Sequence, residues 1–298
     1  MPRRASLSAW LALLAVSIFW GTTYLGIRIS IETLPPAFVV CARFLLSGSI
    51  LLAIARWKGA HLPRGRELWT ACACGLLILG IGNAAAVYAE QIIPSGLASL
   101  FITISPFWLV GFEAMMGGEK LHAPTVGGMI VGFAGTALLL LPGTSGTVSH
   151  NTWLGFLIVE TGVIGWTLGS LYQRRQPAKS HPIVTGAVQQ LAAGILYIPV
   201  VLFVPEGPVI FSTRSTLALL YLVVFGSIVG YSAFIFAMDR LPISIVSVYP
   251  YFNAIVAMWL GWLFFREPFG PREWLAMGII FLGVGIVKWQ TSKKSAGH

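Results

Sequence analysis

Two charged residues lie deep inside apolar segments of the sequence. Arg43 lies about eight residues from the expected outer end of its helix, and Glu160 lies at a similar depth in a helix that runs the same way. At 1.5 Å per residue, both lie roughly 12 Å into the apolar layer, where charges are costly and usually paired or functional. We expect them either to form a buried pair or to bind opposite ends of a substrate. The alternative for Arg43 is a purely structural role, bonded to a partner or to backbone carbonyls.

Aromatic and amide side chains form a second group of candidates. Trp20 and Tyr24 lie one helical turn apart, as do Tyr249 and Asn253, so each pair presents one helix face. Such rings stack on apolar groups, and their polar tips donate hydrogen bonds; the alternative is that several face lipid or the interface. The predicted substrate-binding residues are Trp20, Tyr24, Arg43, Asn83, Trp108, Glu160, Trp166, Tyr231, Tyr249 and Asn253.

Two prolines fall inside predicted helices. Pro106 and Pro250 each remove a backbone hydrogen bond and free a carbonyl that must be satisfied within the protein. We predict a kink at each, which serves either as a gating hinge or as a fixed bend.

Three glutamates lie near predicted helix ends, where structural roles are expected. Glu113 is close to the cytoplasmic end of its helix, so its side chain can extend to the interface. Glu119 and Glu267 follow helices and are expected to cap a helix or to close a loop.

The elements that must position these residues are membrane-spanning helices. The chain has 298 residues, of which 56% are hydrophobic and only 10% charged, and its apolar runs approach the roughly 20 residues that span a bilayer. Backbone groups have no water partner in lipid, so the runs are predicted to be helical, and the protein is an all-α integral membrane protein. Ten spans are predicted, at residues 8–28, 35–56, 68–88, 94–116, 124–142, 152–173, 183–204, 214–237, 243–265 and 271–290.

The distribution of basic residues predicts the orientation. With a cytoplasmic N-terminus, 14 of the 19 Lys and Arg residues fall on the inner side, four on the outer side, and Arg43 inside a helix. The positive-inside rule therefore favours a cytoplasmic location for both termini. It also explains the net charge of +9, so no nucleic-acid partner is expected.

The sequence carries an internal duplication. An offset of 148 residues, without gaps, aligns Gly21 with Gly169 and Tyr24 with Tyr172. The same offset aligns the second-half residues Pro242, Glu267 and Gly283 with a proline, a glutamate and a glycine of the first half. The chain is therefore divided into a first repeat, 1–147, and a second repeat, 148–298. Because each has five helices, the second is predicted to be inverted, which suits alternating access to a central cavity.

Four short motifs carry a resemblance to a known family. They are Ile18-Phe19-Trp20-Gly21, Ala42-Arg43-Phe44, Pro94-Ser95-Gly96-Leu97-Ala98-Ser99-Leu100 and Gly118-Glu119-Lys120-Leu121, with weaker second copies at Leu241-Pro242-Ile243-Ser244 and Arg266-Glu267-Pro268. Over nearly the whole chain, the sequence resembles the EamA type of the drug/metabolite transporter superfamily. It departs from the usual small-residue run after the second-half proline, with Ile243 and Ile245 there.

The resemblance implies a ten-helix carrier in the cytoplasmic (inner) membrane, surrounded by lipid and expected to be a monomer. It looks most like the exporters of neutral and aromatic amino acids, so amino acids are the expected substrates. An exporter of another small metabolite or drug is the alternative. Export itself rests on the resemblance, and Glu160 is the deep carboxylate that could couple transport to protons; a facilitator that needs no ion is equally compatible.

The sequence offers little for the competing classes of protein. An intramembrane enzyme acting on a lipid needs catalytic groups at depth, but all five histidines and Asp239 fall in loops or at helix ends. Neither a charged ring nor a carbonyl filter indicates a channel. Cys41, Cys72 and Cys74 form no metal-binding pattern, so no enzyme activity, metal or cofactor is expected.

Overall fold

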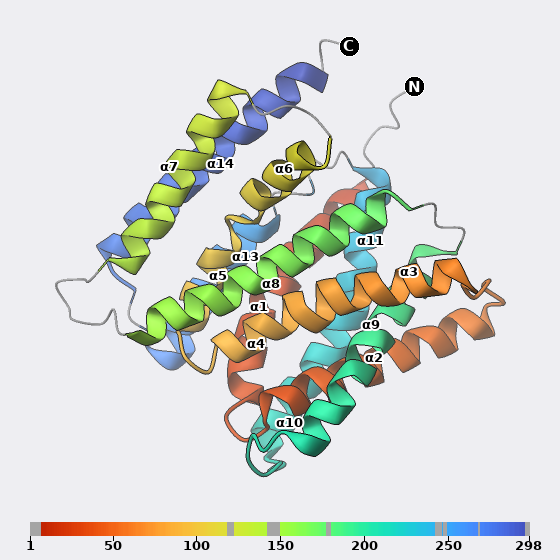
Figure 1. Ribbon diagram of the computed structural model, residues 1–298. Coiled ribbons are helices and arrows are strands. Elements are labelled where there is room, and N and C mark those ends of the chain that lie inside the picture. Colours follow the sequence, from red (N-terminus) through yellow and green to blue (C-terminus); the bar gives the residue numbers. More distant parts are fainter. Residues whose placement is uncertain are drawn as a thin grey trace.

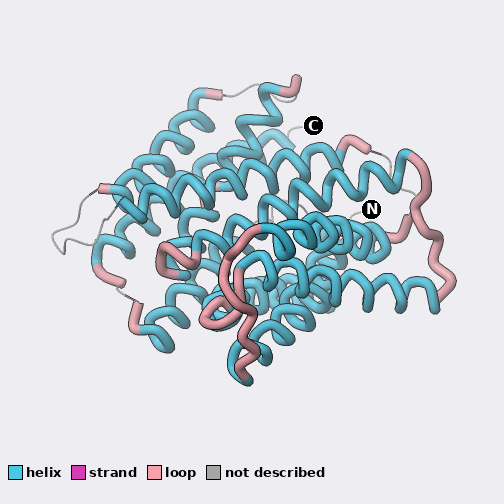
Figure 2. Tube along the Cα trace, turned by 60° about the horizontal axis from the view of Figure 1, so that its bottom comes forward, coloured by secondary structure: helices cyan, strands magenta, loops and turns pink. Residues whose placement is uncertain are grey.

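The computed structural model is helical throughout the part of the chain that it describes. It describes residues 7–117, 122–141, 150–176, 180–241, 246, 249–267 and 269–295, and no strand occurs among them (Figure 2). Eight helices in these ranges are long and apolar enough to cross a membrane. The predicted class, an all-α membrane protein, is therefore confirmed. Glu119 and the segment 242–245 lie outside the described residues.

Six predicted spans correspond to single helices, and the described part of a seventh, predicted at 243–265, contains helix α13. Several helices of the fold, including α6 described below, have proline in the first turn, where the missing N–H costs nothing. The single helices are α1 (Leu7–Ser30), α2 (Pro36–Trp57), α7 (Ala123–Leu140), α8 (His150–Arg174), α9 (Pro182–Phe203), α13 (Tyr249–Phe265) and α14 (Pro271–Ser295). Of these, α13 and α14 are not among the eight apolar candidates, although they cover the last two predicted spans.

Two spans contain a π-helical segment at corresponding positions. In the first half, α3 (Arg66–Gly75), η1 (Leu76–Asn83) and α4 (Ala84–Ala89) follow one another without a break. In the second half, α10 (Thr213–Tyr221), η2 (Leu222–Val229) and α11 (Gly230–Arg240) do the same. π-Helical turns are rare and concentrate at functional sites. Their recurrence in both halves therefore indicates that a functional site lies near these two segments.

The span predicted at 94–116 is broken, which corrects the prediction of one kinked helix. It forms α5 (Ser95–Ile102) and α6 (Ser105–Met115), separated by a turn at Thr103 and Ile104. Pro106 lies in the first turn of α6, because its ring cannot follow a regular helical turn. Pro250 likewise lies at the second position of α13 and does not interrupt that helix. The proline inside a continuous helix is Pro199 of α9, which the sequence analysis did not single out.

Corresponding helices of the two halves pack against each other. Helix α2 packs against α9 and α7 against α14, the latter pair side by side at one edge of the molecule (Figure 1). The remaining contacts are related in the same way. Helix α1 of the first half packs against α13, and its counterpart α8 in the second half packs against α5 and α6. The architecture is thus a two-fold arrangement in which the helices of each half interleave with those of the other.

Glycines allow these pairs to approach at backbone distance. A Cβ added at Gly283 of α14 would lie 2.5 Å from the amide nitrogen of Gly132 and 2.6 Å from the carbonyl oxygen of Gly128 in α7. The equivalent Gly135 faces the carbonyl of Ala276 and the nitrogen of Ile280, at 2.9 and 3.0 Å. As residue numbers rise along one helix they fall along its partner, so α7 and α14 are antiparallel.

The pair α2 and α9 repeats this geometry. A Cβ on Gly48 would lie 2.9 Å from the nitrogen of Leu191 and 3.0 Å from the carbonyl of Ala187. From the other side, a Cβ on Gly194 would lie 2.8 Å from the nitrogen of Leu45. These helices are also antiparallel, and small residues at such contacts are the usual means of close helix packing in membranes.

Carboxylates of one half bind the beginnings of helices in the other. Glu267 accepts hydrogen bonds from the amides of Ser95 and Gly96, at 2.9 and 3.1 Å, at the start of α5. Glu206 accepts from the Ala37 amide, at 2.8 Å, at the start of α2. Each negative charge offsets the positive end of a helix dipole and satisfies an otherwise unpaired N–H. The capping role expected of Glu267 is therefore confirmed.

We predict that Gly283→Ala destabilises the protein, because the new methyl group meets backbone atoms of α7 that cannot move independently. Overpacking of this kind costs about 1–3 kcal/mol. The matched control is Gly285→Ala on the same helix, where a Cβ meets nothing within 4 Å. Thermal unfolding of the purified proteins in detergent, measured by loss of monodispersity, should show a lower Tm for Gly283→Ala alone. Equal Tm values for Gly283→Ala and Gly285→Ala would contradict the close contact between the backbones of α7 and α14.

Candidate functional site

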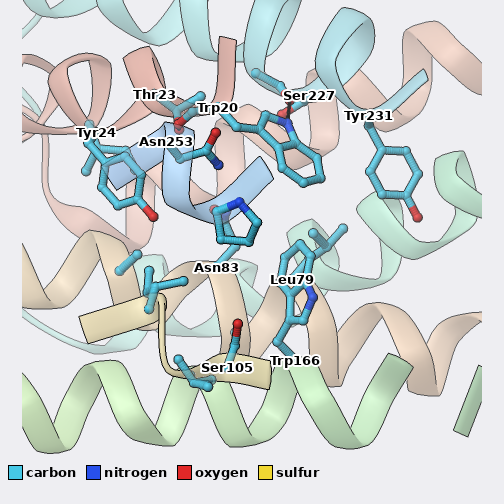
Figure 3. A pocket seen from close by; sticks show the side chains of 18 of the residues that line it. Trp20, Thr23, Tyr24, Leu79, Asn83, Ser105, Trp166, Ser227, Tyr231 and Asn253 are labelled. Atoms are coloured by element: carbon cyan, nitrogen blue, oxygen red, sulfur yellow. Dashed lines mark hydrogen bonds between the residues drawn. The ribbon is translucent and has the colours of Figure 1, made fainter. Parts of the chain in front are cut away.

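A cavity of about 110 Å³ lies at the centre of the interleaved helices. Figure 3 shows Trp20 and Tyr24 of α1, Trp166 of α8 and Tyr231 of α11 around it. Nine of the twelve residues predicted to bind substrate or to gate line this one cavity. These are Trp20, Tyr24, Arg43, Asn83, Trp166, Tyr231, Tyr249, Pro250 and Asn253. Residues from both halves therefore share its wall.

Arg43 is the buried cation of the cavity. Its side chain, on α2, is 4% exposed. Its Nε donates to the Ser227 hydroxyl at 2.8 Å, one Nη donates to the Asn83 side-chain oxygen at 3.2 Å, and the guanidinium lies 5.1 Å from the centre of the Phe44 ring. None of these partners is charged, so the positive charge is positioned but not neutralised by them.

The two π-helical segments supply both partners of Arg43. Asn83 is the last residue of η1, and Ser227 lies within η2. The second guanidinium Nη reaches the backbone of η2, where a Cβ on Gly226 would lie only 2.9 Å from it. The widened turns of a π-helix change the direction of side chains relative to an α-helix. Here they aim one side chain from each half at the same guanidinium.

Helix α9 contributes two buried glutamines that sequence reasoning missed. Gln190 lines the cavity, accepts a hydrogen bond from the Ser47 hydroxyl, and donates to the Ser227 carbonyl at 3.5 Å. Gln189 accepts from the Tyr231 hydroxyl at 2.6 Å and donates to Gln173 at 2.9 Å. Adjacent amides in an apolar run were the available signal, since buried amides require partners.

Aromatic rings form much of the remaining wall. Trp20 makes edge contacts with Trp166 and Tyr249, with ring centroids 6.1 and 5.1 Å apart. The Trp20 Nε1 donates to the Gly226 carbonyl at 2.9 Å, so the indole is fixed in orientation. The Asn253 amide nitrogen can donate to the carbonyls of Ser17 and Tyr249, at 2.8 and 3.1 Å. The wall combines apolar ring surface with a few fixed polar groups, as small-molecule sites usually do.

Glu160, Trp108 and Pro106 do not line this cavity. The Glu160 carboxylate, 6% exposed, accepts a hydrogen bond from the Trp108 indole at 2.6 Å, while its other oxygen has no partner among the described residues. Arg43 bonds instead to Asn83 and Ser227, which overturns the expectation of a buried Arg43–Glu160 pair. The two side chains have different partners: the Arg43 Nε and one Nη donate to residues of the π segments, whereas Glu160 accepts from Trp108.

The remaining predicted carboxylate, Glu113, has an exposed side chain. Glu113 lies 3.8 Å from the Arg174 guanidinium, and both side chains are well exposed. This agrees with the expected position near a membrane surface, and an exposed ion pair of this kind contributes little to stability.

Together the apolar helices and a central cavity lined by aromatic rings and a few fixed polar groups are typical of an α-helical membrane transporter. The family model of the EamA-like transporter family matches residues 7–141 and again residues 153–289. The chain belongs to this family, and its two matches correspond to the two halves of the fold.

Several curated proteins are similar to this chain. The inner membrane transporter YedA of Escherichia coli K12, named as uncharacterized, is 34% identical over 278 residues, which cover 93% of this chain and 89% of YedA. Protein PagO of Salmonella typhimurium is 28% identical over 231 residues, 76% of this chain and 75% of PagO. A chloroplastic WAT1-related protein of Arabidopsis thaliana is 24% identical over 298 residues, which cover 94% of this chain and 69% of that protein.

A solved structure shares the fold. A crystal structure superposes with a TM-score of 0.68 at 21% identity and covers 96% of this chain and 98% of the other. At this identity, the likeness concerns the fold alone.

We predict that Arg43→Lys lowers both Tm and ligand transport. A lysine ammonium is a point charge and cannot reproduce the planar guanidinium, whose separate N–H groups bond to Ser227 and Asn83. Loss of one charge-assisted hydrogen bond costs about 1.5–3 kcal/mol, which corresponds to roughly tenfold or more in rate where the bond acts on transport. The control is Arg56→Lys at the exposed end of the same helix. Wild-type transport by Arg43→Lys, measured in liposomes, would remove Arg43 from the site.

Proposed function

We propose that the protein is a secondary transporter that exports neutral and aromatic amino acids, or similar small metabolites, by alternating access. The observation that carries the proposal is the Arg43 guanidinium, held by uncharged partners inside an aromatic cavity. A zwitterion supplies the missing anion, because its carboxylate can accept from a guanidinium and neutralise it.

The cavity also suits the other parts of such a substrate. An apolar or aromatic side chain can stack on the rings of Trp20, Trp166 and Tyr249, and an ammonium group is attracted to the faces of the same rings. Hydroxyl and amide groups of Thr23 and Gln190, which line the cavity, can accept or donate the remaining hydrogen bonds. A wall that contacts the side chain mainly through ring surface favours several neutral amino acids over a single one.

Alternating access follows from an inverted repeat. We propose ten transmembrane helices, in repeats 1–147 and 148–298, with both termini in the cytoplasm. The antiparallel pairs α2–α9 and α7–α14 and the double family match support this arrangement. Two similar halves of opposite orientation can exchange conformations and so open one central site to either side of the membrane.

The substrate prediction is tested with the purified protein in liposomes and a panel of labelled amino acids. We expect uptake of phenylalanine and leucine above that of empty liposomes, and little uptake of glutamate or lysine, whose extra charge finds no partner in the cavity. Competition by unlabelled non-amino-acid compounds identifies the alternative, an exporter of another metabolite or drug. Absence of amino-acid uptake, with competition only by such compounds, would overturn the proposed substrate class.

The orientation is tested by labelling single cysteines in intact cells, in a variant whose Cys41, Cys72 and Cys74 are replaced. We expect Val148→Cys to react with a membrane-impermeant thiol reagent and Leu62→Cys to react only after the cells are opened. These positions follow from the inward location of the basic residues. The reverse pattern would place both termini outside.

A further inference from the structure

Glu90 carries a buried carboxyl group that has no hydrogen-bond partner among the described residues. It is the residue after the span Arg66–Ala89, and its side chain is completely inaccessible to solvent. Neither carboxyl oxygen has a hydrogen-bond partner among the described residues. A buried carboxylate left in this way is strongly disfavoured, so the neutral, protonated form is the one that fits this environment.

The nearest cation does not neutralise Glu90. The Arg28 guanidinium donates to the main-chain carbonyl of Glu90, and it also lies 5.9 Å from the centre of the Phe265 ring. The nearby Glu267 uses both of its oxygens at the start of α5 and adds a second negative charge. Burial, reinforced by Glu267 and opposed by Arg28, raises the pKa of Glu90 well above its ordinary value.

Glu90 lies directly beyond one end of the cavity. Ala86, four residues earlier on the same helix, lines the cavity, and so does Tyr24, four residues before Arg28 on α1. One helical turn, about 5.4 Å, therefore separates the level of Glu90 from the cavity wall. The Tyr24 phenol lies close enough to Glu90 for the two groups to interact electrostatically. A charge placed in this end of the cavity thus acts on Glu90 through the protein interior.

The other elements packed near Glu90 carry charges with different partners. Helix α8, which packs against α4, carries Glu160, and this carboxylate is bonded to Trp108. Helix α2 carries Arg43, which is bonded to Asn83 and Ser227. Neither group is bonded to the carboxyl group of Glu90. In this conformation a bound proton is therefore what stabilises the Glu90 carboxyl group.

We propose that Glu90 is a proton-binding site that couples transport to the proton gradient. It holds a proton while the cavity is empty and releases it when the ammonium group of a substrate binds near Tyr24 and Ala86. The O–H bond breaks, the electron pair stays on the carboxylate, and the proton passes to water on the side to which the cavity opens. Binding of proton and substrate then oppose each other reciprocally, so one is exchanged for the other across the membrane. The exchange rests on the proposed transport function, whereas the proton site does not.

The proton site is tested without any substrate. Infrared spectra of the purified protein at neutral pH are compared between wild type, Glu90→Gln and the control Glu113→Gln, whose carboxylate is exposed. We expect the carbonyl stretch of a protonated carboxyl in wild type and Glu113→Gln, and its loss in Glu90→Gln. A wild-type minus Glu90→Gln difference that contains only carboxylate bands would overturn the site.

The coupling is tested in liposomes whose interior is one pH unit more acidic than the bath, with equal potassium concentrations and valinomycin holding the membrane potential at zero, because exchange of a proton for a zwitterion moves one net charge. With one proton exchanged per substrate, one pH unit drives about tenfold accumulation of the labelled amino acid that gave the fastest uptake. We expect tenfold accumulation by wild type and by Glu113→Gln. Glu90→Gln mimics the protonated form and cannot release a proton. We therefore expect this variant to bring the substrate only to equal concentrations inside and outside, about onefold.

Four outcomes separate this proposal from the proposed function. Tenfold accumulation by Glu90→Gln would overturn the role of Glu90 in coupling. So would a loss of accumulation in Glu160→Gln while Glu90→Gln still accumulates the substrate. Wild type that equilibrates the amino acid but ignores the pH gradient would also overturn it while leaving the transporter assignment intact. Wild type that transports no amino acid at all would overturn the substrate class and the exchange together, and the infrared result would still decide whether Glu90 holds a proton.

Discussion

The structure depends on a positive charge held inside a protein interior that is surrounded by lipid. A guanidinium in this setting must find hydrogen-bond partners within the fold, because no water of the bilayer can supply them. Arg43 finds them in Asn83 and Ser227, one from each half of the chain. Both halves therefore bond to this one residue at the centre. The unusual turns of η1 and η2, the buried amides of α9 and the aromatic wall all lie around this contact.

Much of the fold could be predicted because hydrophobic run length and backbone satisfaction leave few options in lipid. The positions of nearly all spans, the duplication and the capping role of Glu267 follow from such rules. The break between α5 and α6 and the placement of Pro250 did not follow, because a proline permits either a kink inside a helix or a new helix start. Tertiary packing decides between the two. The π-helical segments have no sequence signature in Leu76–Asn83 or Leu222–Val229 and arise from packing as well.

The candidate site was predictable to the extent that helical spacing brings side chains to one face. Trp20 and Tyr24 shared the cavity with Tyr249 and Asn253 for this reason. Spacing could not foresee that Glu160 turns towards Trp108, since rotation of one helix against another is set by side-chain packing. Glu90 escaped notice because a glutamate at the end of an apolar run resembles an interfacial residue. Its burial arises only in the folded chain, where Arg28 donates to its main-chain carbonyl.

The α7–α14 pair has a further consequence for work on this protein. Within the described ranges, no residue of either helix lines the central cavity, and the pair stands at the edge of the molecule in Figure 1. Its glycine seam must be kept, but its outward face lies away from the cavity. This face is therefore a suitable position for fluorescent reporters, affinity handles or rigid fusion partners, which would enlarge a small membrane protein for imaging without entering the permeation route.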